Sequence, residues 1–313
     1  MFKIEKTHSH KIISIFGIKL KFKRKDVLEI QREVANVLNS FVDIRLCPKA
    51  QGALRELQLA DTLLLKIFHN ICKKHNINYW LADGTLLGAI RHQGFIPWDD
   101  DLDLAIAYDS YDEVVKILQE EFKDSDFTLY GIDKTRFGNA TLRITHKKFE
   151  WLNLDIFYYH SSLLSNDDKE FIKKRRDYYR KIYYKKYKKT IKPNENYEVL
   201  TKFRKELDIP FEKDIKGCSL KEANSLVNQI SSDFKVLNKD WIFPLVKHKF
   251  EDFEFYIPNN AHNVLKETYG NYMSFPPSVI HHGSMFSGFN EEQIKYIQNE
   301  LKIYLKEKFN EEY

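Results

Sequence analysis

Hydrophobic residues recur at steps of three and four from Leu54 onward, which predicts an amphipathic helix that ends before Asn76. The apolar run 79–82 then predicts a strand, and the Asp-Gly-Thr sequence at 83–85 predicts a turn. The apolar residues of 86–89 predict a short helix after that turn. This part of the chain therefore alternates helix and strand.

Further apolar runs at 101–107, 127–130, 141–145 and 151–158 predict four strands, and a helical stripe occupies 111–122. Such a mixture is typical of an α/β or α+β core. The pattern from Pro210 to Trp241 is helical and polar, 250–255 predicts a hairpin, and 294–304 predicts a closing amphipathic helix. We therefore expect an α/β (α+β) fold in which helices flank a mixed sheet and a basic helical segment is inserted.

The amino-terminal 25 residues are basic, and their apolar stretch from Ile12 to Leu20 alternates with polar residues. This pattern predicts a peripheral strand or hairpin. It lacks the small-residue cleavage site of a signal peptide, and no apolar run reaches the roughly 18 residues that cross a bilayer. The sequence thus predicts neither a secretory leader nor a membrane span. Three widely spaced cysteines, Cys47, Cys72 and Cys218, also favour the reducing cytoplasm over a disulfide framework.

The chain of 313 residues has a net charge of only +5, but that charge is unevenly distributed. Residues 169–192 hold twelve Lys and Arg against two acids, a local charge of +10 that leaves about −5 for the rest. Five tyrosines lie among these cations. The segment suits a solvated or partner-covered helix, a contact with anionic lipid or a phosphorylated acceptor, or nucleic-acid binding.

Candidate chemistry is concentrated in three acids. In a strand, Asp101 and Asp103 project to the same face, and Asp155 lies in a second strand with apolar residues on both sides. Paired carboxylates are costly unless a cation neutralises them, and hard oxygen ligands suit Mg²⁺ or Mn²⁺. We therefore expect Asp101, Asp103 and Asp155 to bind metal and to act in catalysis on a phosphoryl group.

Several residues near these acids could bind phosphate. Gly84 and Thr85 form a turn where backbone amides and a hydroxyl can approach an anion. Arg91 and His92 follow this turn, and Arg143 precedes Asp155 as a further candidate for a phosphate clamp. A solvated turn and ordinary surface residues would also explain these features, but the order of the elements favours a site. A strand, a Gly-Thr turn, an Asp-x-Asp strand and a lone Asp in an apolar strand follow one another as in the nucleotidyltransferase superfamily.

Residues 83–103, DGTLLGAIRHQGFIPWDDDLD, closely resemble the signature of the LicD and fukutin-related phosphotransferase family. The resemblance continues at 57–58, 72–77, 154–157, 250–251, 257–258, 269–273 and 276–277, and so spans about residues 50–285. The basic segment looks like a variable insertion. Asp83 departs from the family, which often has a smaller or neutral residue there.

The resemblance implies a nucleotidyltransferase-like fold and transfer of a phospho-alcohol from a CDP-activated donor to a sugar. In the bacterial branch the donor is usually CDP-choline and the acceptor a surface glycan such as lipooligosaccharide, teichoic acid or capsule; in the animal branch the group is ribitol phosphate. Asp101, Asp103 and Asp155 match the metal-binding acids, while Gly84, Thr85 and Arg91 lie where the diphosphate is expected.

A choline group would need aromatic faces, and we expect Trp98 to supply one before the other aromatics near the acids do so. Those others are Tyr108, Trp151, Tyr158 and Tyr159. Asp155 could also orient or deprotonate the attacking hydroxyl, with His281 and His282 as weaker candidates for the base.

We expect four segments: an arm and helix at 1–50, the catalytic core at 51–160, the basic insertion at 161–245, and a part completing the catalytic domain at 246–313. The protein would act in the cytoplasm or at the inner face of the cytoplasmic membrane, where residues 169–192 could contact anionic lipid and a lipid-linked glycan acceptor. No nucleic-acid partner is expected. A metal-dependent glycosyltransferase and a nucleotidyltransferase are the enzymatic alternatives, and a basic nucleic-acid-binding protein with a degenerate core is the non-enzymatic one.

Overall fold

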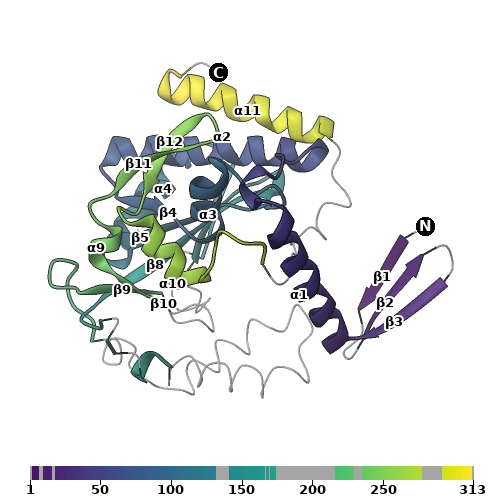
Figure 1. Cartoon of the computed structure of the whole chain (residues 1–313). Helices are drawn as coiled ribbons and strands as arrows, with labels where there is room; N and C mark the ends of the chain where they lie inside the picture. Colours follow the sequence, from purple (N-terminus) through teal and green to yellow (C-terminus); the bar gives the residue numbers. More distant parts are fainter. Residues whose placement is uncertain are drawn as a thin grey trace, which may run out of the picture.

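The computed structural model describes residues 2–6, 10–15, 18–131, 141–165, 167–168, 170–173, 216–228, 235–276 and 291–311, with side chains from residue 29 onward. Helices surround a central mixed sheet, and a small sheet at the amino terminus lies apart from it (Figure 1). The expected α/β architecture is thereby confirmed.

The central sheet has the strand order β10-β9-β8-β5-β4, with β7 also paired to β8 and β6 paired to β7. Its strands are β4 (Tyr79–Leu81), β5 (Asp103–Ala107), β6 (Phe127–Tyr130), β7 (Thr141–His146), β8 (Phe149–Ser162), β9 (Ser225–Asn228) and β10 (Lys235–Asn238). The pair β5 and β8 is parallel and the other pairs are antiparallel. The register of β5 and β8 places the predicted acids Asp103 and Asp155 side by side.

The longest helix, α2 (Gly52–His75), carries the apolar stripe expected from the sequence and ends where Asn76 adopts a left-handed conformation (φ 56°). The carboxyl-terminal helix α11 (Glu291–Phe309) packs along α2 (Figure 1). The remaining helices of the described core are α3 (Asp83–His92), α4 (Tyr111–Glu121), α9 (Lys239–Ile242) and α10 (Ala261–Tyr269). The hairpin β11 (Val246–Phe250) and β12 (Phe253–Ile257) confirms the expected hairpin and packs against β4 and α3.

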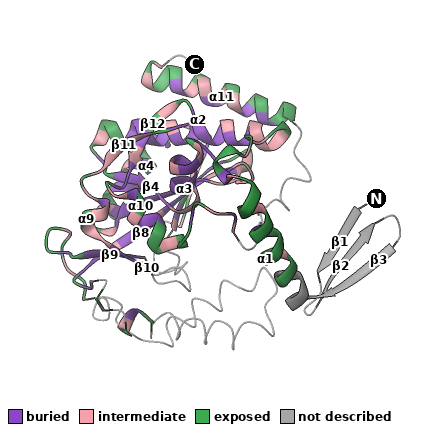
Figure 2. Ribbon diagram, in the orientation of Figure 1, coloured by how far each residue is buried: buried purple, intermediate pink, exposed green. Residues whose placement is uncertain are grey.

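Burial is concentrated in α2, α3 and the central strands (Figure 2). The largest fully buried side chains include Trp80, Tyr79, Phe68 and Tyr111. The rings of Phe68 and Tyr79 meet edge to face at 5.2 Å, which joins α2 to β4. This core fixes α2 against β4, which pairs with β5, the strand that begins at Asp103.

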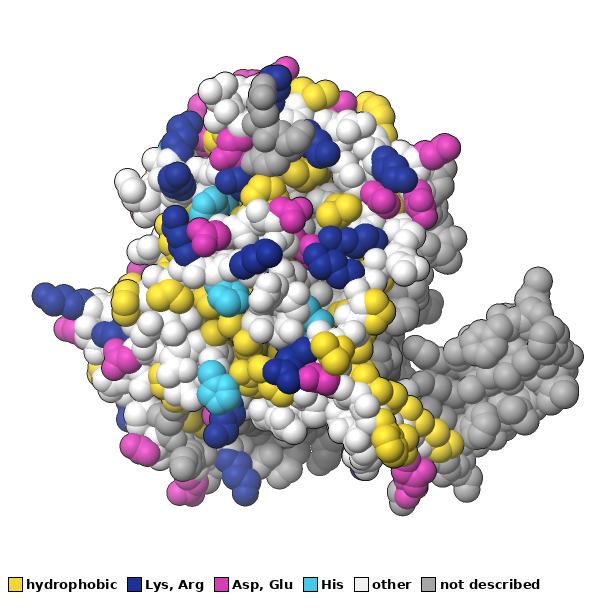
Figure 3. Space-filling model, turned by 45° about the horizontal axis from the view of Figure 1, so that its top comes forward, with side chains coloured by type: hydrophobic (Ala, Val, Ile, Leu, Met, Phe, Trp, Pro, Cys, Tyr) yellow, Lys and Arg dark blue, Asp and Glu magenta, His cyan; other side chains and the backbone are white. Residues whose placement is uncertain are grey.

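The amino-terminal arm forms an antiparallel sheet of β1 (Phe2–Lys6), β2 (His10–Ile15) and β3 (Ile18–Lys23), followed by α1 (Arg24–Phe41). One face of α1 packs through Ala35 and Leu38 against Ile44, Phe275 and Trp98. Another face leaves apolar side chains exposed, and Figure 3 shows apolar side chains gathered along this edge of the molecule. These side chains are Ile30, Val34, Val37 and Phe41.

Three expectations about local structure were wrong. Residues 225–228 and 235–238 are strands that extend the central sheet, not parts of polar helices. Asp83, Gly84 and Thr85 form the first turn of α3 instead of a free turn. Asp101 lies before β5, which begins at Asp103. In each case long-range pairing or a contact with a neighbouring element outweighs the local pattern.

Of the cationic segment 169–192, the structure describes residues 170–173; the rest of the segment, and His281 and His282, lie outside the described residues. The four proposed segment boundaries therefore stay predictions. Within the ranges that are described, no helix combines the length and apolarity needed to cross a bilayer.

Candidate active site

The start of α3 holds Asp103 at the edge of the sheet. The backbone N–H of Gly84 donates to Oδ2 of Asp103 at 3.3 Å, and the backbone N–H of Asp103 donates to the hydroxyl of Thr85 at 2.7 Å. A Cβ on residue 84 would lie 3.0 Å from Oδ2 of Asp99. Glycine therefore lets the acids approach the positive end of the helix, where a carboxylate is stabilised. Gly84 and Thr85 contact an acid here, and their predicted contact with a diphosphate stays a prediction.

Asp103 and Asp155 are opposite each other on the parallel strands β5 and β8, and the N–H of Asp155 donates to the oxygen of Leu102 at 2.9 Å. Burial, reinforced by the charge of Asp101 and then of other acids including Asp155, raises the pKa of Asp103 well above its usual range. Carboxylates this close together repel one another and destabilise the fold unless protons or cations neutralise their charge.

The loop before β5 brings three more acids together. Ligand oxygens of Asp99, Asp100 and Asp101 all lie within 4.8 Å of one another, and the three residues are half-buried. Burial and the charges of Asp101 and Asp100 raise the pKa of Asp99 to about 8. Among the described residues, these acids form the group whose spacing suits a single ion. The predicted ligand set of Asp101, Asp103 and Asp155 shares Asp101 with this group.

Asp155 is paired with Arg143. Nε of Arg143 lies 2.5 Å from Oδ1 of Asp155, and the other guanidinium contact, to Oδ2, is 2.6 Å long. Both side chains line a cavity of about 460 Å³ next to Tyr130, Gly131 and the β7 residues. Arg143 therefore orients Asp155 and also reaches an open space that could admit a substrate.

Arg91 and His92 are turned toward the protein. Arg91 is 6% exposed and donates to the backbone oxygen of Tyr272 at 2.8 Å. Nε2 of His92 lies 3.1 Å from the oxygen of Ile44, so this nitrogen must carry the proton. Burial lowers the pKa of His92 to about 4 and that of Arg91 to about 10. These contacts are structural, and binding of phosphate by either side chain stays a prediction.

Trp98 lies in the loop before β5, directly before Asp99. Its ring stacks on Phe275 at 6.3 Å with an interplanar angle of 19°. The ring of Tyr108 packs against Tyr158 and His160, and Trp151 packs against Phe149. One aromatic residue of the family match at 269–273, for which the sequence indicated no role, is close to the acids. Tyr269, at the end of α10, is 43% exposed and lies within electrostatic range of Asp83, Asp103 and Asp99.

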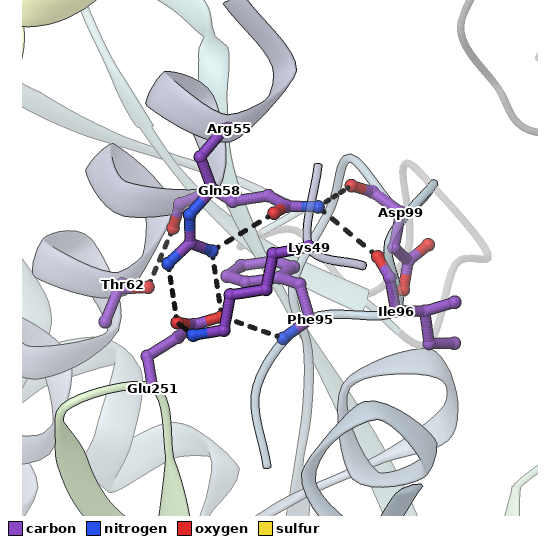
Figure 4. A network of polar contacts seen from close by, with 8 residues as sticks. All are labelled: Lys49, Arg55, Gln58, Thr62, Phe95, Ile96, Asp99 and Glu251. Atoms are coloured by element: carbon purple, nitrogen blue, oxygen red, sulfur yellow. Dashed lines mark hydrogen bonds and ion pairs between the residues drawn. The ribbon is translucent and has the colours of Figure 1, made fainter. Parts of the chain in front are cut away.

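A partly buried polar network holds the acidic loop against the rest of the fold (Figure 4). Nε2 of Gln58 donates to the backbone oxygen of Asp99 at 2.9 Å and to that of Ile96 at 3.3 Å. Arg55 contacts Oε1 of Gln58 and makes a paired contact with Glu251, at 3.0 and 2.7 Å. Lys49 also contacts Glu251, at 2.6 Å. The β11–β12 turn is thus tied through α2 to the loop that carries the acids.

Glu251 is central to this network. It is 3% exposed, adopts a positive φ of 55°, and accepts a hydrogen bond from the N–H of Phe95 at 3.2 Å. A Cβ on residue 94 would lie 2.3 Å from Oε1 of Glu251, so Gly94 is required for this approach. The match of residues 250–251 to the family gave Glu251 no role, and its positive φ could not be seen in the sequence.

Two further charged residues near the acids were missed by the sequence reasoning. Lys235 on β10 forms an ion pair with Asp83, the residue that departs from the family and that has a φ of 39°. Asp61 on α2 is 1% exposed and interacts electrostatically with Asp101, Asp100 and Asp99. Asp61 lies four residues after Leu57 on the apolar stripe, and a charged residue on a buried face was a signal that could have revealed it.

Comparison with known proteins agrees with the resemblance seen in the sequence. Residues 76–193 match the family described as LicD/FKTN/FKRP, nucleotidyltransferase domain. The chain is 29% identical over 245 residues to lipopolysaccharide cholinephosphotransferase LicD of Haemophilus influenzae, covering 72% of this chain and 92% of that protein. A shorter stretch of 30 residues is 60% identical to human ribitol 5-phosphate transferase FKRP, covering 10% of this chain and 6% of that protein. An uncharacterized protein of Rickettsia prowazekii is 46% identical over 66 residues, 21% of this chain and 24% of that protein.

Proposed function

We propose that this chain, a phosphotransferase that carries a LicD-family domain, transfers phosphocholine from CDP-choline to a sugar of a cell-surface glycan and releases CMP. The observation that supports this most is the similarity to the Haemophilus cholinephosphotransferase, which extends over 92% of that protein. The acids at 99–103 and Asp155 lie within residues 76–193, which match the family model. Lipooligosaccharide, teichoic acid and capsule are the acceptor classes that we propose.

We propose that the acids hold Mg²⁺ or Mn²⁺. The residues present fit such an ion because hard carboxylate oxygens converge there, and because both oxygens of buried Asp61 have no hydrogen-bond partner among the described residues. Asp99, Asp100 and Asp101 are close enough to share one ion, and Asp103 and Asp155 flank them. A bound divalent cation would neutralise the donor's diphosphate and the charge that develops on the leaving CMP.

The chain's own groups then position the reactants. Arg143 fixes the carboxylate of Asp155, which can orient the acceptor hydroxyl and take up its proton. The hydroxyl oxygen forms a bond to the phosphorus on the choline side, and the bond from that phosphorus to the oxygen of CMP breaks. Positioning and charge stabilisation account for most of the rate enhancement in phosphoryl transfer of this kind.

Ribitol phosphate is the second candidate for the transferred group. The 60% identity to FKRP over 30 residues favours it, but covers only 6% of that protein. The two donors differ in charge, since choline is a cation and ribitol is neutral. The residues that contact the choline or ribitol group of the donor therefore determine which of the two groups is transferred.

The test is an incubation of the purified protein with CDP-choline and a sugar acceptor, with Mg²⁺ or with EDTA, followed by mass analysis. CMP release with a phosphocholine-sized gain on the acceptor supports the proposal. Addition of CMP to the acceptor would indicate nucleotidyl transfer, and turnover of sugar nucleotides alone would indicate a glycosyltransferase. Equal rates with Mg²⁺ and EDTA would contradict the metal site.

The basic segment has a separate test. We propose that residues 169–192 contact anionic lipid near a lipid-linked acceptor, because their local charge is strongly positive. Sedimentation with anionic vesicles that weakens with salt and is absent with neutral vesicles would support this contact. Equal sedimentation with both kinds of vesicle would contradict it.

A further inference from the structure

Asp61 is a buried carboxylate without a visible structural partner. It lies in the middle of α2, is 1% exposed, and neither of its oxygens has a hydrogen-bond partner among the described residues. Burial, followed by the charges of Asp101, Asp100 and Asp99, raises the pKa of Asp61 well above its usual range. A buried carboxylate without partners is costly and persists only when something compensates it.

Glu121 shows how this fold treats a buried carboxylate that has a structural role. Its side chain is 7% exposed and is surrounded by Lys74, His75 and Lys308 at 2.7 to 3.4 Å. The ammonium groups of Lys74 and Lys308 thus compensate the charge of Glu121. Asp61 instead faces a group of acids, so the charge that compensates it has to come from elsewhere.

The geometry of α2 directs Asp61 toward the acidic loop. Gln58 lies three residues earlier, on the same face of the helix, and its amide holds the backbone of Asp99 at 2.9 Å. Asp61 therefore lies on the helix face that packs under Asp99, and its strongest electrostatic neighbours are the three acids of that loop. Carboxylates therefore come together from two sides: Asp99, Asp100 and Asp101 from the loop, and Asp61 from α2.

We infer that Asp61 contributes a further carboxylate to the cation site of Asp99, Asp100 and Asp101, and holds the ion from the side of α2. The inference rests on the proposed function only in requiring that the site bind a divalent cation. It assigns a metal-binding role to a helix that carries none of the predicted ligands. It also links occupation of the site to the stability of the fold, since the ion would compensate a carboxylate in the core.

The test compares Asp61→Asn with the wild type and with Glu121→Gln, a matched change at a buried carboxylate that is paired. Mn²⁺ binding is measured by calorimetry and by electron paramagnetic resonance, and melting temperatures are measured in EDTA and with Mn²⁺. We expect Asp61→Asn to weaken Mn²⁺ binding by at least about tenfold, as loss of a supporting group at a metal site commonly does. In EDTA it should melt at or above the wild-type temperature, because it replaces a buried carboxyl group that has no hydrogen-bond partner among the described residues.

The control is expected to behave in the opposite way. Glu121→Gln should bind Mn²⁺ as the wild type does and should melt at a lower temperature in EDTA. Asp61→Ser provides a second neutral variant. Wild-type affinity for Mn²⁺ in Asp61→Asn would overturn the inference, and so would failure of both Asp61 variants to fold in EDTA, because this would show a purely structural role.

The outcomes separate this inference from the proposed function. A wild type that binds Mn²⁺ through Asp61 but releases no CMP from CDP-choline would sustain the metal site and contradict the transfer reaction. A wild type that transfers phosphocholine in EDTA and binds no Mn²⁺ would overturn the inference and leave the transfer reaction standing.

Discussion

Arg143 and Asp155 face each other across β7 and β8 in the antiparallel register and are joined by two hydrogen bonds of 2.5 and 2.6 Å. A guanidinium holds a carboxylate in one plane, which an ammonium cannot do. Asp155 is therefore fixed in orientation beside Asp103 before any substrate arrives.

This pairing predicts that Arg143→Lys lowers activity although the charge is kept. We expect a loss of at least about tenfold in kcat, since a misoriented group commonly costs that much. Arg143→Lys and Asp155→Asn should be non-additive when combined, because the two residues act through one contact. The measurement is steady-state CMP release from CDP-choline by the two single variants and the double variant. Additive losses would show that the two residues act independently.

Replacing either acid of the Asp-x-Asp sequence should abolish turnover and leave the fold intact. Asp101→Asn and Asp103→Asn each remove a charge that the proposed metal site needs, while the amide keeps the size of the side chain. The melting temperature in EDTA should not fall, since burial among other acids already disfavours the charged form of Asp103. Normal CMP release by a folded double variant would end the assignment of these acids.

Glu251→Gln should destabilise the protein in a pH-dependent manner. Burial disfavours the charge of Glu251, but hydrogen bonds from Arg55 and Lys49 outweigh burial and lower the pKa from 4.5 to about 2. A lowered folded-state pKa contributes stability above the unfolded pKa, and this contribution is lost as pH falls toward 2. At pH 7 we expect a loss of about 3–5 kcal/mol in the free energy of unfolding, the usual result of breaking a buried ion pair.

Urea denaturation at pH 7, 5 and 3 measures this effect. The difference between the wild type and Glu251→Gln should be largest at pH 7 and should narrow toward pH 3. Glu254→Gln is a suitable control because Glu254 is exposed on the same hairpin, and it should change stability by less than about 0.5 kcal/mol. A constant difference across this pH range would contradict the ion-pair explanation.

Gly88→Ala should reverse the usual effect of this substitution in a helix. Alanine normally stabilises a helix by about 0.5–1 kcal/mol relative to glycine. In α3, however, a Cβ on residue 88 would lie 2.4 Å from the backbone oxygen of Gly94 and 3.1 Å from the backbone nitrogen of Ile96. We expect a destabilisation of about 1–3 kcal/mol, as overpacking gives, together with reduced activity because the loop leading to the acids shifts. A gain in melting temperature would refute the close packing.

Trp98 can be tested for selectivity between donors. If its ring contacts the choline cation, Trp98→Leu should weaken use of CDP-choline by about 0.5–2 kcal/mol, or roughly 2- to 30-fold in KM, and leave a neutral CDP-alditol unaffected. Tyr269→Leu provides the comparison, because Tyr269 is also near the acids. The measurement is KM for both donors. An equal loss with both donors would show that Trp98 acts on the loop and not on choline.

The regular elements of the catalytic core could be predicted because their patterns are local. The stripe of α2 and the apolar runs of β4 to β8 follow the periods of a helix and a strand, and Asn76 is a recognisable helix end. The strands at 225–228 and 235–238 could not be predicted in the same way. They are four residues long each, and only their pairing with each other and with β8 makes them strands.

The sequence located the site but did not show which residues from distant segments surround it. The spacing of Asp101, Asp103 and Asp155 identified the region, and the parallel register confirms that Asp103 and Asp155 are neighbours. The partners were not visible, because they depend on contacts between distant segments. Arg55 and Glu251 are separated by 196 residues, and Lys235 and Asp83 by 152. Residues such as Asp61 gain meaning only once α2 is placed under the acidic loop.

The polar network that holds the acidic loop through Glu251 has a consequence for the synthesis of the protein. The acids at 99–103 and Asp155 leave the ribosome well before Glu251, the residue whose side chain ties the loop to Arg55 and to the N–H of Phe95. A nascent chain that ends before the β11–β12 turn already contains these acids but lacks the tie that fixes their loop. Partly synthesised chains should therefore be inactive. The protein should become active only late in translation, when Glu251 of the β11–β12 turn reaches Arg55 and Phe95.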